Sequence, residues 1–445
     1  MVGPPGASAQ RMVAGMLRVL SGRAPLGDRR GCAAPTAICF PKLPVAPVPG
    51  ARAGELIGSP LRPSNDLLAN DCQPASRARS GEPSMIDFEP TDEQALIIET
   101  VHQFAENEIR PHGRGSDEAG APPQSVVEAA HELGLVANSL PESQGGGGER
   151  SALTGALIAE ELAWGDLAIA LAILSPALVA FPVADHGSKS LQKQLLPGLM
   201  NTSFRPGSLA IVEPRLDFDV YHPHTIAKQD GDEFMLDGVK CQVPWLEGGS
   251  HVVVVAALGG GLAAFVADRD AGGLSATPEQ NMGLGGLPTV ELELSGLRIP
   301  GEARLSASDA DLRRLIDRGR VALAAAGVGT ARAAFEVSRD YAKQRETFGQ
   351  PIATRQAIAF KLADMAIEID GARLLVWEAA AALDRGEETT RLARLAYDQT
   401  TRIALQVADG AVQVFGGYGY IRDYLPELHL RNVAGFASFE ALALV

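Results

Sequence analysis

The sequence is short of positive charge, and this shortage excludes two classes of partner. Its 445 residues carry 39 basic against 54 acidic side chains, which gives a formal net charge of −15. A nucleic-acid binder needs a basic surface to neutralise phosphates, and attraction to an anionic membrane surface needs the same sign of charge. We therefore expect neither a nucleic-acid partner nor a membrane partner.

Cysteine is also scarce, with four residues in the whole chain. Three of them precede residue 84, so Cys241 is alone in the remainder. A disulfide framework or a cysteine-based zinc site needs several such residues close together. We predict no disulfide framework and no metal site in residues 85–445.

No apolar run is long and uninterrupted. The longest, Leu167 to Ala184, contains Pro176 and Pro182. A membrane-spanning helix needs about 20 consecutive apolar residues. This run is instead predicted to form a pair of buried helices.

Several catalytic signatures are missing. No G-x-G-x-x-G lies between a predicted strand and a predicted helix, and neither a serine-centred elbow nor H-E-x-x-H occurs. A nicotinamide site of the Rossmann type and the commonest hydrolase classes are therefore unsupported.

Residues 1–84 differ in composition from the rest of the chain. They hold ten basic and five acidic residues and twelve of the 29 prolines, without helical or strand periodicity. This composition predicts a disordered extension. The arginine-rich, acid-poor start is also compatible with an organelle transit segment. We expect a cytoplasmic protein, with the mitochondrial matrix as the alternative if 1–84 is a transit segment.

Hydrophobic periodicity divides the remainder into three domains. In 85–205, apolar residues recur at three-to-four spacing, as from Leu96 to Ile109, which predicts helices. In 206–308, short apolar runs bounded by Gly, Asp and Pro predict strands, with a hairpin turn at Asp230-Gly231. In 309–445, long apolar stripes such as Ile358 to Leu383 predict a helical bundle. The predicted class is α+β.

Three sequence segments are more specific than this pattern. Tyr341 to Met365 reads Y-x-x-x-R-x-x-F-G-x-P-I and then Q-x-x-x-x-K-L-A-D-M, Gln413 to Tyr424 reads QVFGGYGYIRDY, and Leu140 to Gly146 reads LPESQGG. Together they resemble the acyl-CoA dehydrogenase family, and the resemblance covers essentially all of 85–445. It implies an N-terminal α-helical domain, a middle β-barrel-like domain and a C-terminal four-helix bundle.

The resemblance also implies a reaction and its partners. The expected activity is the FAD-dependent α,β-dehydrogenation of an acyl-CoA thioester to the 2-enoyl-CoA, with electrons passed to an electron-transfer flavoprotein. The expected assembly is a homotetramer or homodimer. The chain length and branching of the acyl group stay open. The resemblance implies FAD contacts at Val212, Val243, Pro244, Arg345, Thr347, Phe348, Gln356, Gln413, Val414, Gly416 and Gly417.

The reaction needs a carboxylate that removes the α-proton of the substrate. In the family this residue is a glutamate shortly after the Gly-Gly segment, which corresponds to Glu440. Some relatives carry it instead one residue before an arginine of an earlier helix, and here those positions are Gly319 and Arg320. Glu440 is therefore the predicted base, and Arg320 is expected to line the site and to contact substrate or stabilise charge.

The chain departs from the family pattern where the flavin is expected. Val212 and Phe218 stand where hydroxyl residues are usual, and Gln242-Val243-Pro244-Trp245 replaces W-I-T-N. After Glu440, the usual Gly-Thr is Ala441-Leu442. These changes leave an alternative open, a non-catalytic partner subunit of a heteromeric acyl-CoA dehydrogenase. An acyl-CoA oxidase that uses oxygen directly is a third interpretation.

Overall fold

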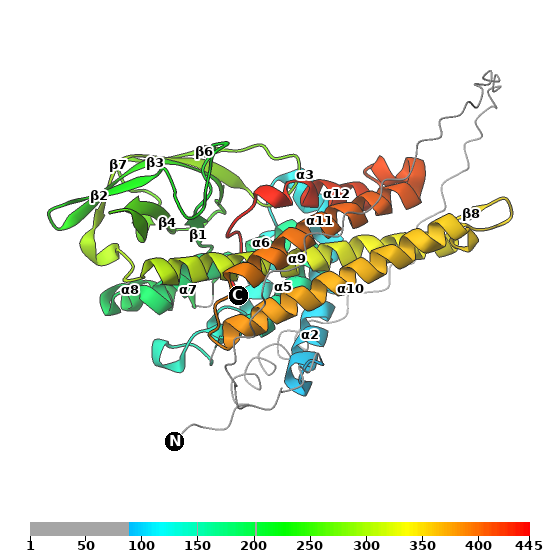
Figure 1. Cartoon of the computed structure of the whole chain (residues 1–445), viewed down its shortest axis with the longest axis horizontal. Coiled ribbons are helices and arrows are strands. Elements are labelled where there is room, and N and C mark those ends of the chain that lie inside the picture. Colours follow the sequence, from blue (N-terminus) through cyan, green and yellow to red (C-terminus); the bar gives the residue numbers. More distant parts are fainter. Residues whose placement is uncertain (1–88, 149, 201–202) are drawn as a thin grey trace, which may run out of the picture. The chain divides into compact units, whose positions relative to one another are not determined.

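The computed structural model describes residues 89–148, 150–200 and 203–445. The predicted extension and the transit-segment alternative lie outside these residues. In chain order, helices are followed by a sheet and then by long helices (Figure 1). This order is the predicted α+β arrangement.

The first helix starts with a capping box and ends earlier than predicted. In α2 (Asp92–Phe104), the Thr91 side chain accepts the Gln94 N–H and the Gln94 side chain accepts the Thr91 N–H. The helix does not continue to Ile109, because a π-helical turn, η1 (Ala105–Ile109), and a 3₁₀ turn, η2 (Arg110–His112), follow. Pro111 causes this break, since its ring lacks an N–H and clashes with the preceding turn of an α-helix.

Six further helices complete the N-terminal domain. They are α3 (Gly113–Ala119), α4 (Gln124–Glu132), α5 (Ala152–Gly165), α6 (Leu167–Leu174), α7 (Ala177–His186) and α8 (Lys189–Leu199), with 3₁₀ turns η3 (Ala137–Ser139) and η4 (Glu142–Gln144).

The apolar run forms α6 and α7, separated at Ser175-Pro176. By length and composition Leu167–His186 could cross a membrane, but its most apolar 18-residue window is entirely buried inside the protein. The prediction of a buried helix pair is therefore confirmed.

The middle domain is built on one seven-stranded sheet. Its strands are β1 (Ser208–Ala210), β2 (Ile226–Asp230), β3 (Glu233–Pro244), β4 (His251–Leu258), β5 (Gly261–Asp268), β6 (Leu274–Pro278) and β7 (Thr289–Pro300). The order is β1-β4-β2-β3-β7-β6, with β5 paired to β4. Strand β6 was not predicted from the sequence, because it is short and has no buried side chains.

Register irregularities in β3 position one site segment. The pairing of β3 with β7 shifts between Lys240 and Val243, and Gln242 adopts a left-handed φ of 55°. Such a bulge bends a strand and redirects a side chain. Gln242 is thereby turned out of the regular alternation of the sheet.

Three long helices dominate the C-terminal domain. They are α9 (Asp309–Gln344), α10 (Gln356–Asp384) and α11 (Thr390–Phe415), followed by η7 (Gly416–Tyr420), α12 (Pro426–Ala434) and η8 (Phe436–Ser438). A hairpin of β8 (Glu346–Thr347) and β9 (Gln350–Pro351), then η6 (Ile352–Thr354), joins α9 to α10. Phe348 and Gly349 form its two-residue turn with positive φ, as type I′ hairpins require.

The N-terminal helices and the bundle share one core, and α5 packs closely on α9. A Cβ atom at Gly329 would lie 2.0 Å from the carbonyl oxygen of Glu160, so only glycine permits this approach. Largely shielded ion pairs also join α5 to the bundle: Arg332 of α9 donates to Glu161 at 2.7 Å, and Arg373 of α10 donates to Glu160 at 3.0 Å. Burial raises the pKa of Glu160 despite these arginines.

Candidate active site

The predicted base and the predicted arginine lie against each other. Arg320 Nη2 donates to Glu440 Oε1 at 2.8 Å, and Arg320 Nε lies 3.1 and 3.2 Å from the two carboxylate oxygens. The side chains are 3% and 11% exposed, so the pair is largely shielded from water. Burial opposes the guanidinium charge, but the hydrogen bonds and charge of Glu440 outweigh it and raise the pKa of Arg320.

The two positions at which relatives carry the base converge in this structure. A Cβ atom at Gly319 would lie 3.2 Å from Cα of Ala441, the residue after Glu440. Helix α9 and the C-terminal segment therefore bring both positions to one place. Ala441 has a left-handed φ of 53°, a conformation that normally favours glycine.

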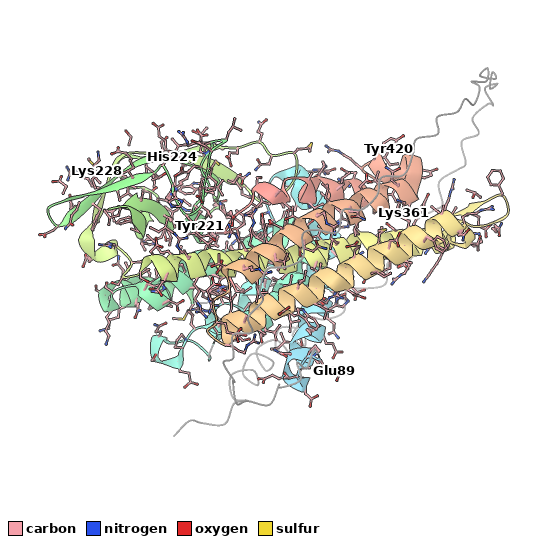
Figure 2. The ribbon with its side chains drawn as sticks, viewed as in Figure 1. Glu89, Tyr221, His224, Lys228, Lys361 and Tyr420 are labelled. Atoms are coloured by element: carbon pink, nitrogen blue, oxygen red, sulfur yellow. The ribbon has the colours of Figure 1, made fainter. Side chains whose placement is uncertain are left out.

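Tyr221, which was not predicted from the sequence, joins this pair. It lies on the loop between β1 and β2 (Figure 2), and its hydroxyl accepts a hydrogen bond from Arg320 Nη1 at 2.7 Å. Burial raises the pKa of Tyr221, although the Arg320 charge acts in the opposite direction. The phenol is therefore neutral near pH 7. The loop departs from the family pattern, so no motif pointed to this tyrosine.

The loop that carries Tyr221 is tied to the sheet by a buried carboxylate. Glu213 accepts the backbone N–H groups of His224 and Thr225, both at 2.8 Å, and pairs with Lys240 at 2.9 Å. Burial lowers the pKa of Lys240 to about 8. Burial alone would raise the pKa of Glu213, but the Lys240 charge and the hydrogen bonds lower it.

Tyr397 anchors the segment that carries Glu440. This tyrosine of α11 is 2% exposed, and its hydroxyl donates to the carbonyl oxygens of Phe436 and Phe439. A buried tyrosine hydroxyl normally has such a partner. The sequence places Tyr397 on the apolar face of its helix, but it does not reveal which backbone groups the hydroxyl reaches.

The residues predicted to hold the FAD phosphates gather at one end of the bundle. The Arg345 guanidinium lies 5.6 Å from the Tyr418 ring centre and has no ion pair within the described residues. A Cβ atom at Gly416 would meet nothing within 4 Å, and one at Gly417 only the Tyr420 hydroxyl at 3.8 Å. Open glycine backbone beside a free arginine suits a diphosphate group.

The other residues predicted to contact FAD at this end of the bundle differ in exposure. Phe348 projects from the β8–β9 turn and is 97% exposed, beside the half-buried Thr347. Gln356 and Gln413 are exposed, at the start of α10 and near the end of α11. Val414 is 4% exposed, so the structure leaves little of this residue open to a ligand.

The predicted contacts in the β-domain lie mostly inside the sheet. Val243 is fully buried in the β-domain core, and the carbonyl of Pro244 accepts the Ser208 hydroxyl. Val212 is also buried, and its carbonyl accepts the Cys241 N–H at 2.9 Å. Because these residues are buried, only atoms at their edges could contact a cofactor.

Gln242 differs from these neighbours, because its side chain reaches the segment that carries Glu440. Its Nε2 donates to Ser438 Oγ at 3.1 Å, two residues before Glu440. Its Oε1 is buried without a hydrogen-bond partner in the described part of the chain. A buried acceptor without a partner is costly, so this atom is suited to a donor supplied by a bound group. Phe218, where a hydroxyl is usual, is partly buried and packs against the core.

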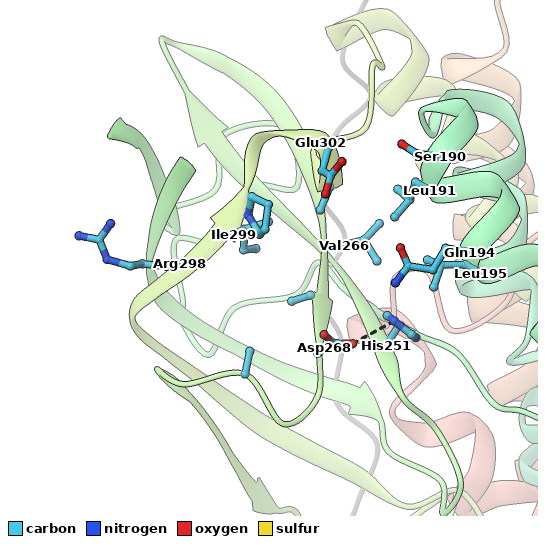
Figure 3. A pocket seen from close by; sticks show the side chains of 14 residues that line it. Ser190, Leu191, Gln194, Leu195, His251, Val266, Asp268, Arg298, Ile299 and Glu302 are labelled. Carbon is cyan, nitrogen blue, oxygen red and sulfur yellow. Dashed lines mark ion pairs between the residues drawn. The ribbon is translucent and has the colours of Figure 1, made fainter. Parts of the chain in front are cut away.

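A separate cavity of about 180 Å³ lies between α8 and the sheet (Figure 3). Ser190 and Gln194 of α8 face it, opposite His251 and Asp268, which are paired at 3.0 Å. None of the predicted site residues lines this cavity.

Family models match the chain on both sides of the sheet. "Acyl-CoA dehydrogenase, N-terminal domain" matches residues 91–203, and "Acyl-CoA dehydrogenase, C-terminal domain" matches residues 311–440. The chain belongs to the acyl-CoA dehydrogenase family. The matched C-terminal range ends on Glu440.

This family member aligns with its relatives over almost their whole length. The chain is 35% identical over 364 residues to "Probable acyl-CoA dehydrogenase YngJ" of Bacillus subtilis, covering 78% of this chain and 94% of that protein. Butyryl-CoA dehydrogenase of Megasphaera elsdenii matches with a TM-score of 0.73 and 28% identity, over 81% of this chain and 96% of that one. A structure described as electron transferring flavoprotein of Acidaminococcus fermentans matches with a TM-score of 0.72 and 28% identity, over 79% and 94%.

Family membership establishes the protein as an FAD flavoprotein and an oxidoreductase acting on CH–CH groups. Groups that suit FAD lie at two separate places in the chain. Arg345 and the open glycine backbone would hold its phosphates. The unpartnered Gln242 Oε1 offers an acceptor near Glu440.

Proposed function

We propose that this acyl-CoA dehydrogenase converts an acyl-CoA thioester to the 2-enoyl-CoA, with Glu440 as the base. The observation that carries the proposal is the buried pair of Glu440 with Arg320. The guanidinium holds the carboxylate oxygens in one place, and a positioned carboxylate can act as the general base that accepts the α-proton. Bound FAD supplies the acceptor for the hydride that leaves the β-carbon.

The chain's own residues perform three tasks in this reaction. Glu440 takes the α-proton as the double bond forms. Arg320 holds the carboxylate in place through its Nε–Nη2 edge. Tyr397 fixes the backbone that carries the base. The carboxylate is shielded from water, which strengthens these electrostatic interactions.

We further propose an electron-transfer flavoprotein as the electron acceptor. The structural likeness to a protein described as an electron transferring flavoprotein supports this proposal. With such an acceptor, turnover in air produces no stoichiometric peroxide. Stoichiometric peroxide would favour the oxidase interpretation instead.

A homo-oligomer is the proposed assembly. Helix α10 exposes Phe360, Ile367 and Leu374 at intervals of seven residues, which places them on one face. On α11, Leu395 and Leu405 are also exposed. A second copy of the chain would bury such a surface. Light scattering should then give a multiple of the chain mass, and Ile367→Glu should lower it.

The test of the function is a panel of acyl-CoA thioesters added to the purified flavoprotein. Bleaching of the flavin absorbance by one of them, with formation of the matching 2-enoyl-CoA, is the expected result. A protein without bound flavin that cannot be reconstituted with FAD would refute it. Flavin retained only in a mixture with a second family member would instead favour the partner-subunit alternative.

A further inference from the structure

We propose that Tyr221 is a positioning residue for proton abstraction, because its hydroxyl orients the Arg320 guanidinium toward Glu440. The inference rests on the proposed function of Glu440 as the base. It adds a residue that lies outside every motif of the sequence. It is carried by the geometry of three side chains from three separate segments of the chain.

The guanidinium is divided between two partners. Its Nε–Nη2 edge faces Glu440, and its Nη1 donates to the Tyr221 hydroxyl at 2.7 Å. A guanidinium is planar and its donors have fixed directions. Fixing Nη1 therefore fixes the plane of the other two nitrogens, and with it the position of the carboxylate that they hold.

Tyr221 is itself held firmly. Its backbone N–H donates to Asp219 Oδ1 at 2.9 Å. Its ring is faced by Arg313, whose guanidinium lies 4.5 Å from the ring centre and pairs with Asp309. Arg313 and Arg320 both lie on α9, two turns apart. Tyr221 contacts both of them, so its position in the loop is tied to this stretch of the helix.

The choice of a phenol has an electrostatic consequence. A phenol is neutral near pH 7, and burial raises the pKa of Tyr221 further, so Tyr221 binds Nη1 without placing a second negative charge beside Arg320. Asp317, one turn earlier on α9, is occupied by the hydroxyls of Thr389 and Thr390 at 3.0 and 3.1 Å. Tyr397 of α11 also lies near the Arg320–Glu440 pair, and both charges act on its pKa in opposite directions. Among these neighbours, the carboxylate of Glu440 alone makes an ion pair with Arg320 in the described residues.

The test compares Tyr221→Phe with the parent enzyme. Phenylalanine keeps the ring that faces Arg313 and removes only the hydroxyl. We expect kcat to fall about tenfold, equivalent to ~1.4 kcal/mol, with KM within about twofold, because the lost bond acts on the base and not on the substrate. The probe is whichever of butyryl-, octanoyl-, palmitoyl- or isovaleryl-CoA the parent oxidises fastest.

A double-mutant cycle shows whether the effect passes through the arginine. In an Arg320→Lys background, the forked edge is gone, so Tyr221→Phe should have little further effect on kcat. An equal fall in both backgrounds would overturn the inference and leave Tyr221 with a general structural role. A rise in KM at unchanged kcat would also overturn it, since Tyr221 would then bind substrate.

A matched control and a ligand-free measurement complete the design. Arg215→Gln removes a charge from the same loop, where the Arg215 side chain pairs with Asp217 and contacts neither Tyr221 nor Arg320, and we expect kcat within about twofold. In the holoenzyme without substrate, the Arg320 Nε–H resonance, assigned by its loss in Arg320→Lys, should exchange faster with solvent in Tyr221→Phe. Unchanged exchange would refute the orienting role. Faster exchange in a protein that oxidises no acyl-CoA would instead refute the proposed function alone.

Discussion

Replacing Glu440 by glutamine should abolish dehydrogenation while leaving the site assembled. The amide has almost the shape of the carboxylate and still offers an oxygen to the Nε–Nη2 edge of Arg320. It has no useful basicity. Loss of the reaction with retained flavin and retained acyl-CoA binding would therefore isolate proton abstraction from every other role of the residue.

The magnitude follows from two separate effects. Removing a general base typically costs about 10²–10⁴-fold in rate, and the upper end applies here because abstraction begins the only productive route. The structural effect is smaller, since Arg320 exchanges charge-assisted bonds for neutral ones, roughly 1–2 kcal/mol in the free energy of unfolding. Glu440→Ala would cost about 3–5 kcal/mol, because it leaves a buried guanidinium unpaired.

The assay is single-turnover bleaching of the flavin by an acyl-CoA that the parent oxidises. A variant that bleaches within about tenfold of the parent rate, well below the usual loss of a base, would show that Glu440 is not the base. Thermal denaturation of Glu440→Gln and Glu440→Ala serves as the control. Equal melting temperatures would contradict the pairing with Arg320.

The same site offers a rescue. Gly319 faces Ala441, with its Cβ position 3.2 Å from Cα of that residue. We expect Gly319→Glu to restore part of the bleaching rate in a Glu440→Gly background, because a carboxylate from α9 would reach the same space. The 3.2 Å contact requires a small shift of the C-terminal segment, so the rescue should be incomplete.

Three further predictions concern other parts of the molecule. Arg345→Ala should weaken FAD binding about 10–100-fold through loss of a charge-assisted contact, with only partial recovery in Arg345→Lys; equal flavin-to-protein absorbance ratios in all three proteins would contradict this. Tyr397→Phe should lower the free energy of unfolding by roughly 2 kcal/mol, because two buried carbonyls lose their donor, and a melting temperature equal to the parent's would argue against it. Burial, aided by neighbouring arginines, lowers the pKa of His429 to about 3 from its ordinary value of 6.5. Between these two pKa values the unfolded chain binds a proton at His429 that the folded chain does not bind. The free energy of unfolding therefore falls as the pH drops below 6.5. His429→Leu should therefore lose on the order of 2 kcal/mol less stability than the parent between pH 7 and pH 5. An equal loss in the two proteins over the same denaturation series would contradict this.

The sequence by itself determined the order of the domains and most of the elements. Apolar spacing of three to four residues marked the helices now seen as α2, α5 and the three long helices of the bundle. Alternating runs marked most strands of the sheet. These signals are local, because each turn of a helix or each pair of strand residues repeats the same periodicity.

Local signals failed where geometry departs from a regular repeat. The helix that begins at Asp92 ends in a π turn because Pro111 lies beyond it. Strand β6 has no buried face to pattern it. The bulge at Gln242 depends on pairing with a strand some fifty residues later.

Motifs located two of the three side chains of the candidate site, but tertiary structure alone joined them. Arg320 and Glu440 are 120 residues apart, and Tyr221 precedes Arg320 by 99. Nothing in the neighbourhood of Tyr221 distinguishes it from other loop tyrosines. Its role arises because Glu213 ties the loop to the sheet and the bundle brings α9 beneath it. Contacts between distant segments depend on how whole elements pack, and no periodicity along the chain encodes them.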